Sequence, residues 1–284
     1  MPSILRQIAV VHTYYYTDPF CPWSWALEPA LRKLAVEFSD GLDVRHVMCG
    51  MAREFGDPGH LVGEMLEASE ESGMPVDPRV WLTDAPRSSH PACLAVKAAS
   101  EQGEVGGVLS RYLRRLREGI QCRRRKLDTA DALVAEARGV PGLDVERLRL
   151  GLASHGVLEA FAADLDRCGA VPPEHFSEGS DRVKLPSLEF VGDDGSVHGV
   201  YGPSSYPELR AAAVAAGADP AGGSGSASLS MEDALRRFGS MSTTKMTTMC
   251  DLPRPRAPAE LWRLALEWRV KPERLGTGYL WSLA

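Results

Sequence analysis

The feature that most constrains this chain is a strand, a turn, a helix and a second strand that follow one another near its start. Residues Ile8 to Tyr16 read IAVVHTYYY, a β-branched and aromatic run without Gly or Pro that is typical of a strand. Apolar side chains recur at helical spacing from Trp23 to Phe38, and Leu42 to Met48 predicts a second strand. Such a βαβ unit crosses over right-handed into a parallel pair, so we expect an α/β protein.

The rest of the chain divides into an insertion, a hairpin and an appendage. Helical periodicity dominates from about residue 60 to 175, which predicts an inserted helical subdomain. Strand patterns return at Leu188 to Val191 and Ser196 to Val200, joined by an Asp-Gly turn, and a helix is predicted at Tyr206 to Gly217.

We therefore predict a first domain at residues 8–217, a linker at 218–230 and a small C-terminal helical appendage at 231–284. Glycine and serine fill the linker from Gly222 to Ser226. In the appendage three short helices are expected, and the last should pack against other parts of the protein because apolar residues cover most of its circumference. Their bounds are Met231–Phe238, Thr244–Cys250 and Pro258–Trp268.

Charge and hydropathy exclude several classes of partner. The formal net charge is −6, so no global basic field would attract nucleic acid or anionic lipid. A membrane span needs about 20 consecutive apolar residues, and the sequence contains no such run. The first residues also lack a secretory signal pattern. We expect a cytoplasmic protein with no nucleic-acid or membrane partner.

The six cysteines are too widely spaced for a structural zinc site, so no metal is expected. They stand at positions 21, 49, 93, 122, 168 and 250, without a C-x₂-C pair. Cys21 stands out because it lies between a predicted strand and a predicted helix, with Pro22 in the first helical turn. Free N–H groups at a helix start favour an anion, which predicts a pKa for Cys21 below the usual value of about 8.5. The alternative is a buried structural cysteine.

The segment from Tyr14 to Trp25, which contains D-P-F-C-P-W-S-W, resembles the active-site motif of the DsbA-like branch of the thioredoxin superfamily. More narrowly it is similar to the cytoplasmic FrnE/YjbH-type members, whose motif runs D-P-x-C-P-W-C-W. Ser88 to Ala92 resembles the S-S-x-P-A segment of that family, and Leu185-Pro186 stands where the family keeps its cis-proline. The resemblance covers about residues 8–217 and implies a thioredoxin-like fold with a helical insertion.

The resemblance also assigns site residues. It implies Cys21 as the nucleophile and a cis peptide bond between Leu185 and Pro186, with Pro186 at the substrate-backbone site. The neighbouring residues would shape the loop or the substrate-binding surface; they are Asp18, Pro19, Pro22, Trp23, Trp25 and Leu185.

Ser24 stands where this motif has its second cysteine, and that departure limits the chemistry. Disulfide exchange in a C-x-x-C protein needs the second thiol to release the mixed disulfide. Cys21 could instead work with a small thiol such as glutathione as co-substrate and resolving group. Cys49 could be the resolving thiol, since it follows the second strand at the same sheet edge. The serine could also be an engineered trap.

Three functions remain open on this basis. The first, which the motif favours, is a cytoplasmic thiol–disulfide oxidoreductase that acts through Cys21 on a thiol- or disulfide-containing protein or a small thiol, without a tightly bound cofactor. The second is a YjbH-type adaptor for regulated proteolysis with reduced redox activity. The third is a glutathione-type transferase or isomerase, because related kappa-class transferases and chromene-carboxylate isomerases work without a C-x-x-C pair.

Overall fold

The computed structural model describes residues 10–103, 107–220 and 229–284. The predicted glycine- and serine-rich linker segment from Gly222 to Ser226 and the first nine residues lie outside these ranges. Within them, no helix combines the length and the apolar character that crossing a membrane requires.

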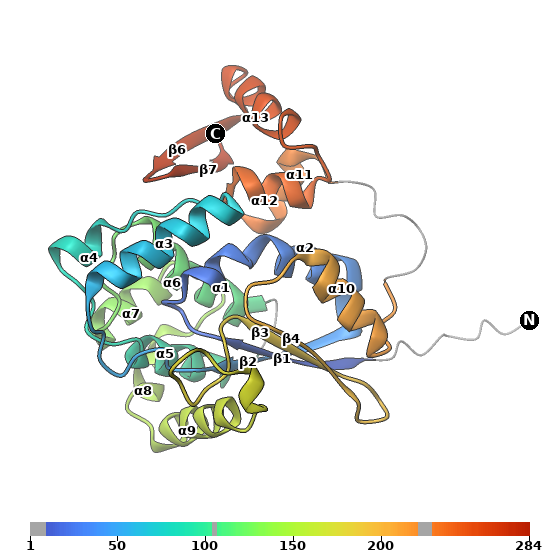
Figure 1. The fold of residues 1–284 in the computed structure, drawn as a ribbon. Helices are drawn as coiled ribbons and strands as arrows, with labels where there is room; N and C mark the ends of the chain where they lie inside the picture. Colours follow the sequence, from blue (N-terminus) through green and yellow to red (C-terminus); the bar gives the residue numbers. More distant parts are fainter. Residues whose placement is uncertain (1–9, 104–106, 221–228) are drawn as a thin grey trace, which may run out of the picture.

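A four-stranded sheet in the order β2-β1-β3-β4 forms the centre of the first domain (Figure 1). Strand β1 (Val11–Thr17) pairs in parallel with β2 (Leu42–Met48) and antiparallel with β3 (Ser187–Val191). Strand β3 continues into an antiparallel hairpin with β4 (Val197–Tyr201). The predicted parallel βαβ unit and the predicted hairpin are therefore both present.

The connection from β1 to β2 is two helices rather than the single helix expected. Helix α1 (Pro22–Ala26) ends at Leu27, and α2 (Glu28–Phe38) follows at once, with a short 3₁₀ turn (Ser39–Gly41) before β2. Pro29 lies in the first turn of α2 and has no N–H to donate to the preceding turn. The proline therefore separates α1 from α2 although the apolar periodicity continues through both.

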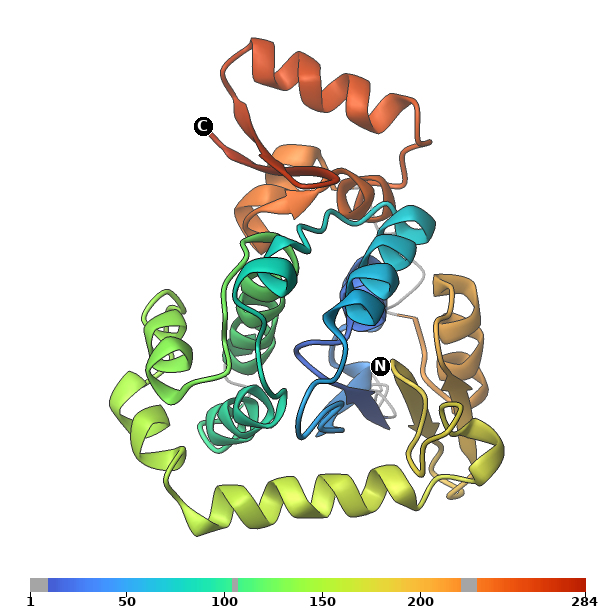
Figure 2. The same cartoon turned by 60° about the vertical axis from the view of Figure 1, so that its left-hand side comes forward.

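The helical insertion between β2 and β3 shares its core with the loop after β1. Figure 2 shows its helices, cyan to yellow-green, alongside the sheet. Phe20, Trp25 and Met48 belong to the same buried cluster as the apolar faces of α5 and α6. The insertion therefore packs against the end of the sheet at which β1 and β2 terminate, where the predicted site lies. Its helices are α3 (Pro58–Ser72), α4 (Arg79–Thr83), α5 (His90–Ser100), α6 (Val108–Cys122), α7 (Ala130–Ala137), α8 (Val145–Gly151) and α9 (His155–Gly169), followed by a 3₁₀ turn (Pro173–His175).

The two faces of the sheet are covered by different elements. Helices α2 and α10 (Tyr206–Ala215) bury apolar side chains of β1 and β3 in one cluster that includes Leu34 and Phe190. On the other face, the end of α9 packs near the end of β2. Figure 1 shows α2 and α10 above the sheet and α9 below it.

The C-terminal module is not purely helical, which corrects the predicted appendage. The predicted helices are present as α11 (Met231–Phe238), α12 (Thr243–Met249) and α13 (Arg256–Leu266). A three-stranded sheet in the order β5-β7-β6 joins them. Its strands are β5 (Met241–Ser242), β6 (Val270–Leu275) and β7 (Gly278–Leu283).

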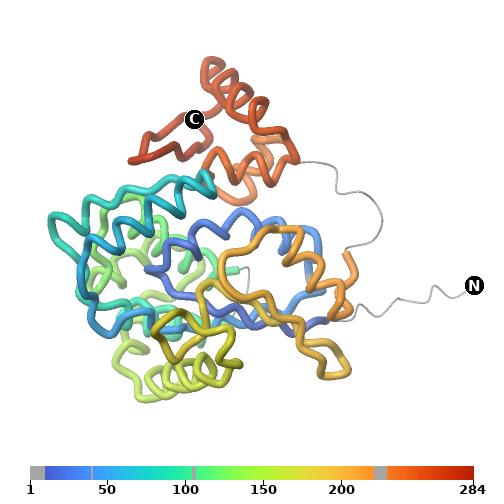
Figure 3. The backbone as a smooth tube through the Cα atoms, in the orientation of Figure 1, coloured from blue at the N-terminus to red at the C-terminus, as the bar shows by residue number. Residues whose placement is uncertain are grey.

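The sequence pattern concealed β6 because the strand contains Pro272 and is mostly exposed at the sheet edge, where charged residues and proline are tolerated. The module packs against the first domain, and its last helix α13, which was expected to pack rather than stand free, packs against α12 and β6 of the module itself. Val36 of α2 contacts the module's apolar core, and α12 lies against α2. Figure 3 shows the module, orange to red, over the blue and cyan helices.

Candidate functional site

Cys21 is the N-cap residue of α1, as its place between strand and helix predicted. Its Sγ accepts a hydrogen bond from the backbone N–H of Ser24 at 3.4 Å. The thiol is nevertheless buried, with 3% of the residue exposed. Burial raises the pKa of Cys21 to about 11, and the hydrogen bonds from Ser24 oppose this only in part. The expectation of a lowered pKa is therefore wrong, because loss of water outweighs the effect of a five-residue helix.

Ser24 is fully buried and belongs to a polar network behind the thiol. Its hydroxyl oxygen accepts a hydrogen bond from the Thr17 hydroxyl at 2.9 Å. The Thr17 oxygen accepts in turn from Arg117, whose guanidinium also donates to the Tyr15 hydroxyl at 3.1 Å and pairs with Glu28 at 3.0 Å. The serine thus replaces a thiol with a group that is hydrogen-bonded into the interior.

Asp18 holds the loop before Cys21 in place rather than facing a ligand. Its carboxylate accepts backbone hydrogen bonds from Phe20 at 2.8 Å and Met51 at 2.7 Å, and the Cys93 thiol donates to it at 3.2 Å. The side chain is fully buried, and burial raises its pKa. Asp18 therefore connects the motif loop to the segment after β2 and to α5.

Trp25 and Pro22, two further candidates for substrate contact, also lie in the interior. Only 1% of Trp25 is exposed, and its indole N–H donates to the Pro75 carbonyl at 2.9 Å. Pro22 is buried in the first turn of α1. These two residues and Asp18 shape the site from within, whereas Trp23 and Leu185 remain partly exposed.

Cys21, Trp23, Cys49 and Leu185 line one cavity of about 270 Å³. The peptide bond between Leu185 and Pro186 is cis, in agreement with the sequence-based prediction, and Pro186 itself is buried. The remaining lining residues come from α3 and from the segments after β2 and before β3; they are Met51, His60, Glu64, Ser177, Ser180, Arg182 and Val183.

Trp23 also lines a second cavity of about 290 Å³. Leu27, Pro203 and Glu208 are among the residues of that second cavity. Trp23 therefore borders two hollows of the surface, one of which is also lined by Cys21.

The Cys49 thiol contacts a cysteine that the sequence analysis did not single out. The Sγ of Cys49 lies 2.8 Å from the Sγ of Cys168, and both residues are buried. Cys168 is 119 positions away and lies on α9, so no local motif connects the two. The structure brings Cys49 to the Cys21 cavity, as expected, but its direct thiol partner is Cys168.

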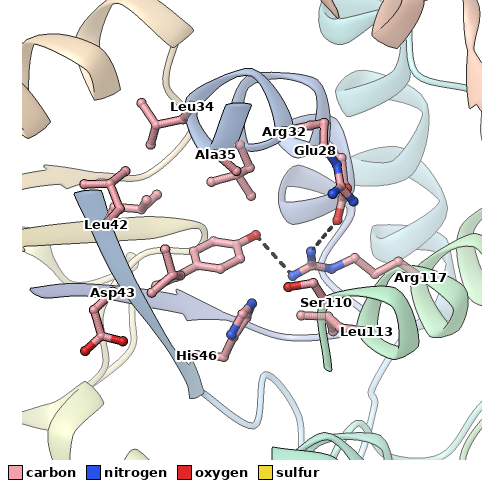
Figure 4. A pocket seen from close by; sticks show the side chains of 14 residues that line it. Glu28, Arg32, Leu34, Ala35, Leu42, Asp43, His46, Ser110, Leu113 and Arg117 are labelled. Carbon is pink, nitrogen blue, oxygen red and sulfur yellow. Dashed lines mark hydrogen bonds and ion pairs between the residues drawn. The ribbon is translucent and has the colours of Figure 1, made fainter. Parts of the chain in front are cut away.

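A further cavity of about 300 Å³ lies between α2, β2 and α6, beside the buried polar network (Figure 4). Figure 4 shows the Arg117 side chain reaching toward the Glu28 carboxylate, with which it pairs. Burial opposes ionisation of Glu28, but the charges of Lys245 and Arg117 outweigh it and hold its pKa below the usual range. Lys245 comes from α12, so this network joins the C-terminal module to the first domain. Elsewhere in the described ranges, no group of three or more His, Cys, Asp or Glu side chains could hold a metal ion.

Comparison with known proteins identifies relatives over most of the chain. Residues 14–168, more than half of the sequence, match a family model described as Thioredoxin. The ClpXP adapter protein SpxH of Halalkalibacterium halodurans is 27% identical over 284 residues, covering 94% of this chain and 87% of that protein. The ClpXP adapter protein SpxH of Bacillus subtilis is 28% identical over 198 residues, covering 68% and 62%.

Two solved structures share the fold. A putative protein disulfide isomerase from Nitrosomonas europaea matches with a TM-score of 0.60 and 16% identity, over 72% of this chain and 97% of that chain. The cytosolic disulfide reductase DsbM from Pseudomonas aeruginosa matches with a TM-score of 0.52 and 20% identity, over 66% and 88%. Together with the family model, these matches confirm the predicted thioredoxin-like fold.

Proposed function

Because the chain belongs to the thioredoxin family, we propose that it has kept the family's protein-binding surface and works as a cytoplasmic adaptor that presents a protein for degradation. The observation that carries this proposal is the state of Cys21. Its thiol is buried, its pKa is raised to about 11, and Ser24 occupies the position of the resolving cysteine. The motif alone favoured the oxidoreductase; the geometry supports the adaptor.

The chemical argument concerns the thiolate, which is the nucleophile in disulfide exchange. Because burial raises the pKa of Cys21 to about 11, only a very small fraction of the thiol is ionised at pH 7. A mixed disulfide that did form would also lack a resolving thiol within the motif. Both steps of an exchange cycle are therefore slow.

The binding argument rests on Trp23 and its surroundings. Trp23 lines two cavities, and partly exposed Leu185 and Met51 add apolar surface to the one that Cys21 also lines. Tryptophans in such positions carry much of the binding energy of protein interfaces. Arg182, Glu64 and His60 add charged and polar groups at the edge. This surface suits the binding of an apolar side chain of a protein partner, with the polar groups contacting the partner's neighbouring residues.

The relatives support a specific class of partner. Curated proteins similar over 94% of this chain are named ClpXP adapter proteins. We therefore propose ClpXP as the protease and a protein substrate as the second partner. The DsbA-like fold leaves the thiol chemistry as a second candidate, because Cys21 lines a cavity in which a small thiol such as glutathione could serve as co-substrate.

The proposal is tested by protein half-lives in cells that lack the chain. Pulse labelling should reveal proteins that are stabilised by the deletion, and restoring either the wild type or Cys21→Ala should return their rapid turnover. Trp23→Ala should fail to restore it, whereas Trp262→Ala, which alters an exposed tryptophan of α13, should succeed. If Cys21→Ala fails while Trp23→Ala succeeds, thiol chemistry rather than binding is the function.

A further inference from the structure

Two cysteines outside the motif are close enough to react with each other. The Sγ atoms of Cys49 and Cys168 are 2.8 Å apart. A disulfide bond is about 2.05 Å long, so closure needs an approach of about 0.8 Å. No other pair of cysteines among the described residues is recorded in such contact, and Cys21 has Ser24, not a thiol, as its hydrogen-bond partner.

The backbone on both sides holds this arrangement. Cys49 directly follows β2, and its N–H donates to the Thr17 carbonyl at 2.9 Å. Cys168 lies in the last turn of α9, and its carbonyl accepts from the N–H of Val183 at 3.2 Å. Both cysteines belong to a small buried cluster with Tyr16, Val47, Val171 and Val183. Their proximity therefore follows from packing of the sheet against α9, not from a mobile loop.

Only one of the two thiols borders the cavity. Cys49 lines the hollow that also contains Cys21, whereas Cys168 is fully buried and does not line it. Arg182 donates to the carbonyls of Cys49 at 3.0 Å and Gly50 at 2.9 Å, which places a positive charge at this wall of the cavity. Cys49 is therefore the thiol of this pair that a small anionic disulfide would meet first. Burial raises the pKa of Cys49, as it does for Cys21, so we expect its oxidation to be slow as well. Unlike Cys21, however, Cys49 has a second thiol in direct contact that can complete the exchange.

We propose that Cys49 and Cys168 are a second redox centre, separate from Cys21, that forms a reversible disulfide with a low-molecular-weight disulfide as oxidant. The Cys49 thiol loses its proton and attacks one sulfur of the oxidant, whose S–S bond breaks and releases one thiol. Cys168 then loses its proton and attacks the sulfur of Cys49, which releases the second thiol. Two cysteine thiols are oxidised and one disulfide molecule is reduced to two thiols.

The disulfide would covalently link two segments of the chain that contribute different residues to the lining of the cavity. Cys49 belongs to the sheet edge, while Cys168 begins the segment that carries Ser177, Ser180 and Arg182 and leads to Leu185. Oxidation would therefore covalently attach the start of the segment from 168 to 185 to the residue that follows β2. The partner-facing cavity would become more rigid in the oxidised protein, but the inference about the disulfide itself does not depend on the adaptor function.

The test uses the full chain and oxidised glutathione. After incubation, remaining thiols are blocked under denaturing conditions, and the digested protein is analysed by mass spectrometry without and with reduction. We expect a peptide pair joined through Cys49 and Cys168, a mass loss of two hydrogen atoms in the intact protein, and full reversal by a reducing thiol. Cys250→Ala, which removes a buried cysteine of the C-terminal module, should give the same linkage.

Single cysteine substitutions then test which of the two thiols reacts with glutathione first. Cys168→Ala should accumulate a glutathione adduct on Cys49, whereas Cys49→Ala should leave Cys168 unmodified. Cys21→Ala should still form the linkage. Two outcomes would overturn the proposal. One is a linkage between Cys21 and Cys49. The other is wild-type protein in which Cys49 and Cys168 stay reduced although other thiols have been oxidised. The wild-type peptide map decides the matter even if one variant fails to fold.

Discussion

The backbone N–H of Ser24 points at the Sγ of Cys21 and donates to it over 3.4 Å. The helix start that would activate a thiol is therefore intact, and the residue that would complete a dithiol is a serine. Its hydroxyl accepts from Thr17 within the network around Arg117. The site has the geometry of a redox motif without the exposure or the second thiol that redox turnover requires.

We expect the reactivity of Cys21 to rise steadily with pH. Its pKa is raised to about 11 by burial, so the thiolate fraction increases about tenfold per pH unit between pH 7 and 10. The rate of alkylation by iodoacetamide, followed at the Cys21 peptide, should increase in the same proportion. A plateau below pH 8.5 would mean that the thiol is activated after all.

Ser24→Cys should restore dithiol chemistry. The position lies within hydrogen-bond reach of Cys21 through its backbone, and a thiol there could resolve a mixed disulfide. Insulin reduction should rise at least about tenfold over the wild type, which is expected to be nearly inactive. Ser24→Ala serves as the control, because it removes the hydroxyl without supplying a thiol. Equal activity of all three proteins would show that burial alone prevents exchange.

Lys245→Met should destabilise the protein and loosen the C-terminal module. The Nζ of Lys245 lies 3.3 Å from the Glu28 carboxylate, both residues are buried, and burial lowers the pKa of Lys245. Removal of one partner leaves a buried charge with less compensation, at a cost of about 3 kcal/mol. Urea denaturation followed by tryptophan fluorescence measures this cost. Lys271→Met, on exposed β6, should change stability little.

Trp23→Ala should weaken binding of the degraded substrate or of ClpX at least about tenfold, since an interface tryptophan is worth more than 1.4 kcal/mol. The circular dichroism spectrum should not change, because Trp23 is partly exposed and lines two cavities. Binding measured by surface plasmon resonance for Trp262→Ala provides the comparison. Identical affinities for the two variants would place the interface elsewhere.

The sequence by itself determined the helices and strands that depend on interactions between residues close together in the chain. The strand predicted at Leu42–Met48 appears as β2 with the predicted bounds, and Met231–Phe238 appears as α11. Hydrophobic period, capping residues and turn residues act over a few positions, so they can be read without the fold. The motif around Cys21 was likewise located at its helix start.

Only the tertiary structure decided what these elements do. The pKa of Cys21 depends on how much water reaches it, and that follows from how α3 and the segments around β2 and β3 close over α1. The contact between Cys49 and Cys168 joins residues 119 positions apart through the packing of α9 against β2. Burial and long-range contacts depend on which segments pack together in the folded protein. Patterns of neighbouring residues in the sequence do not specify that packing.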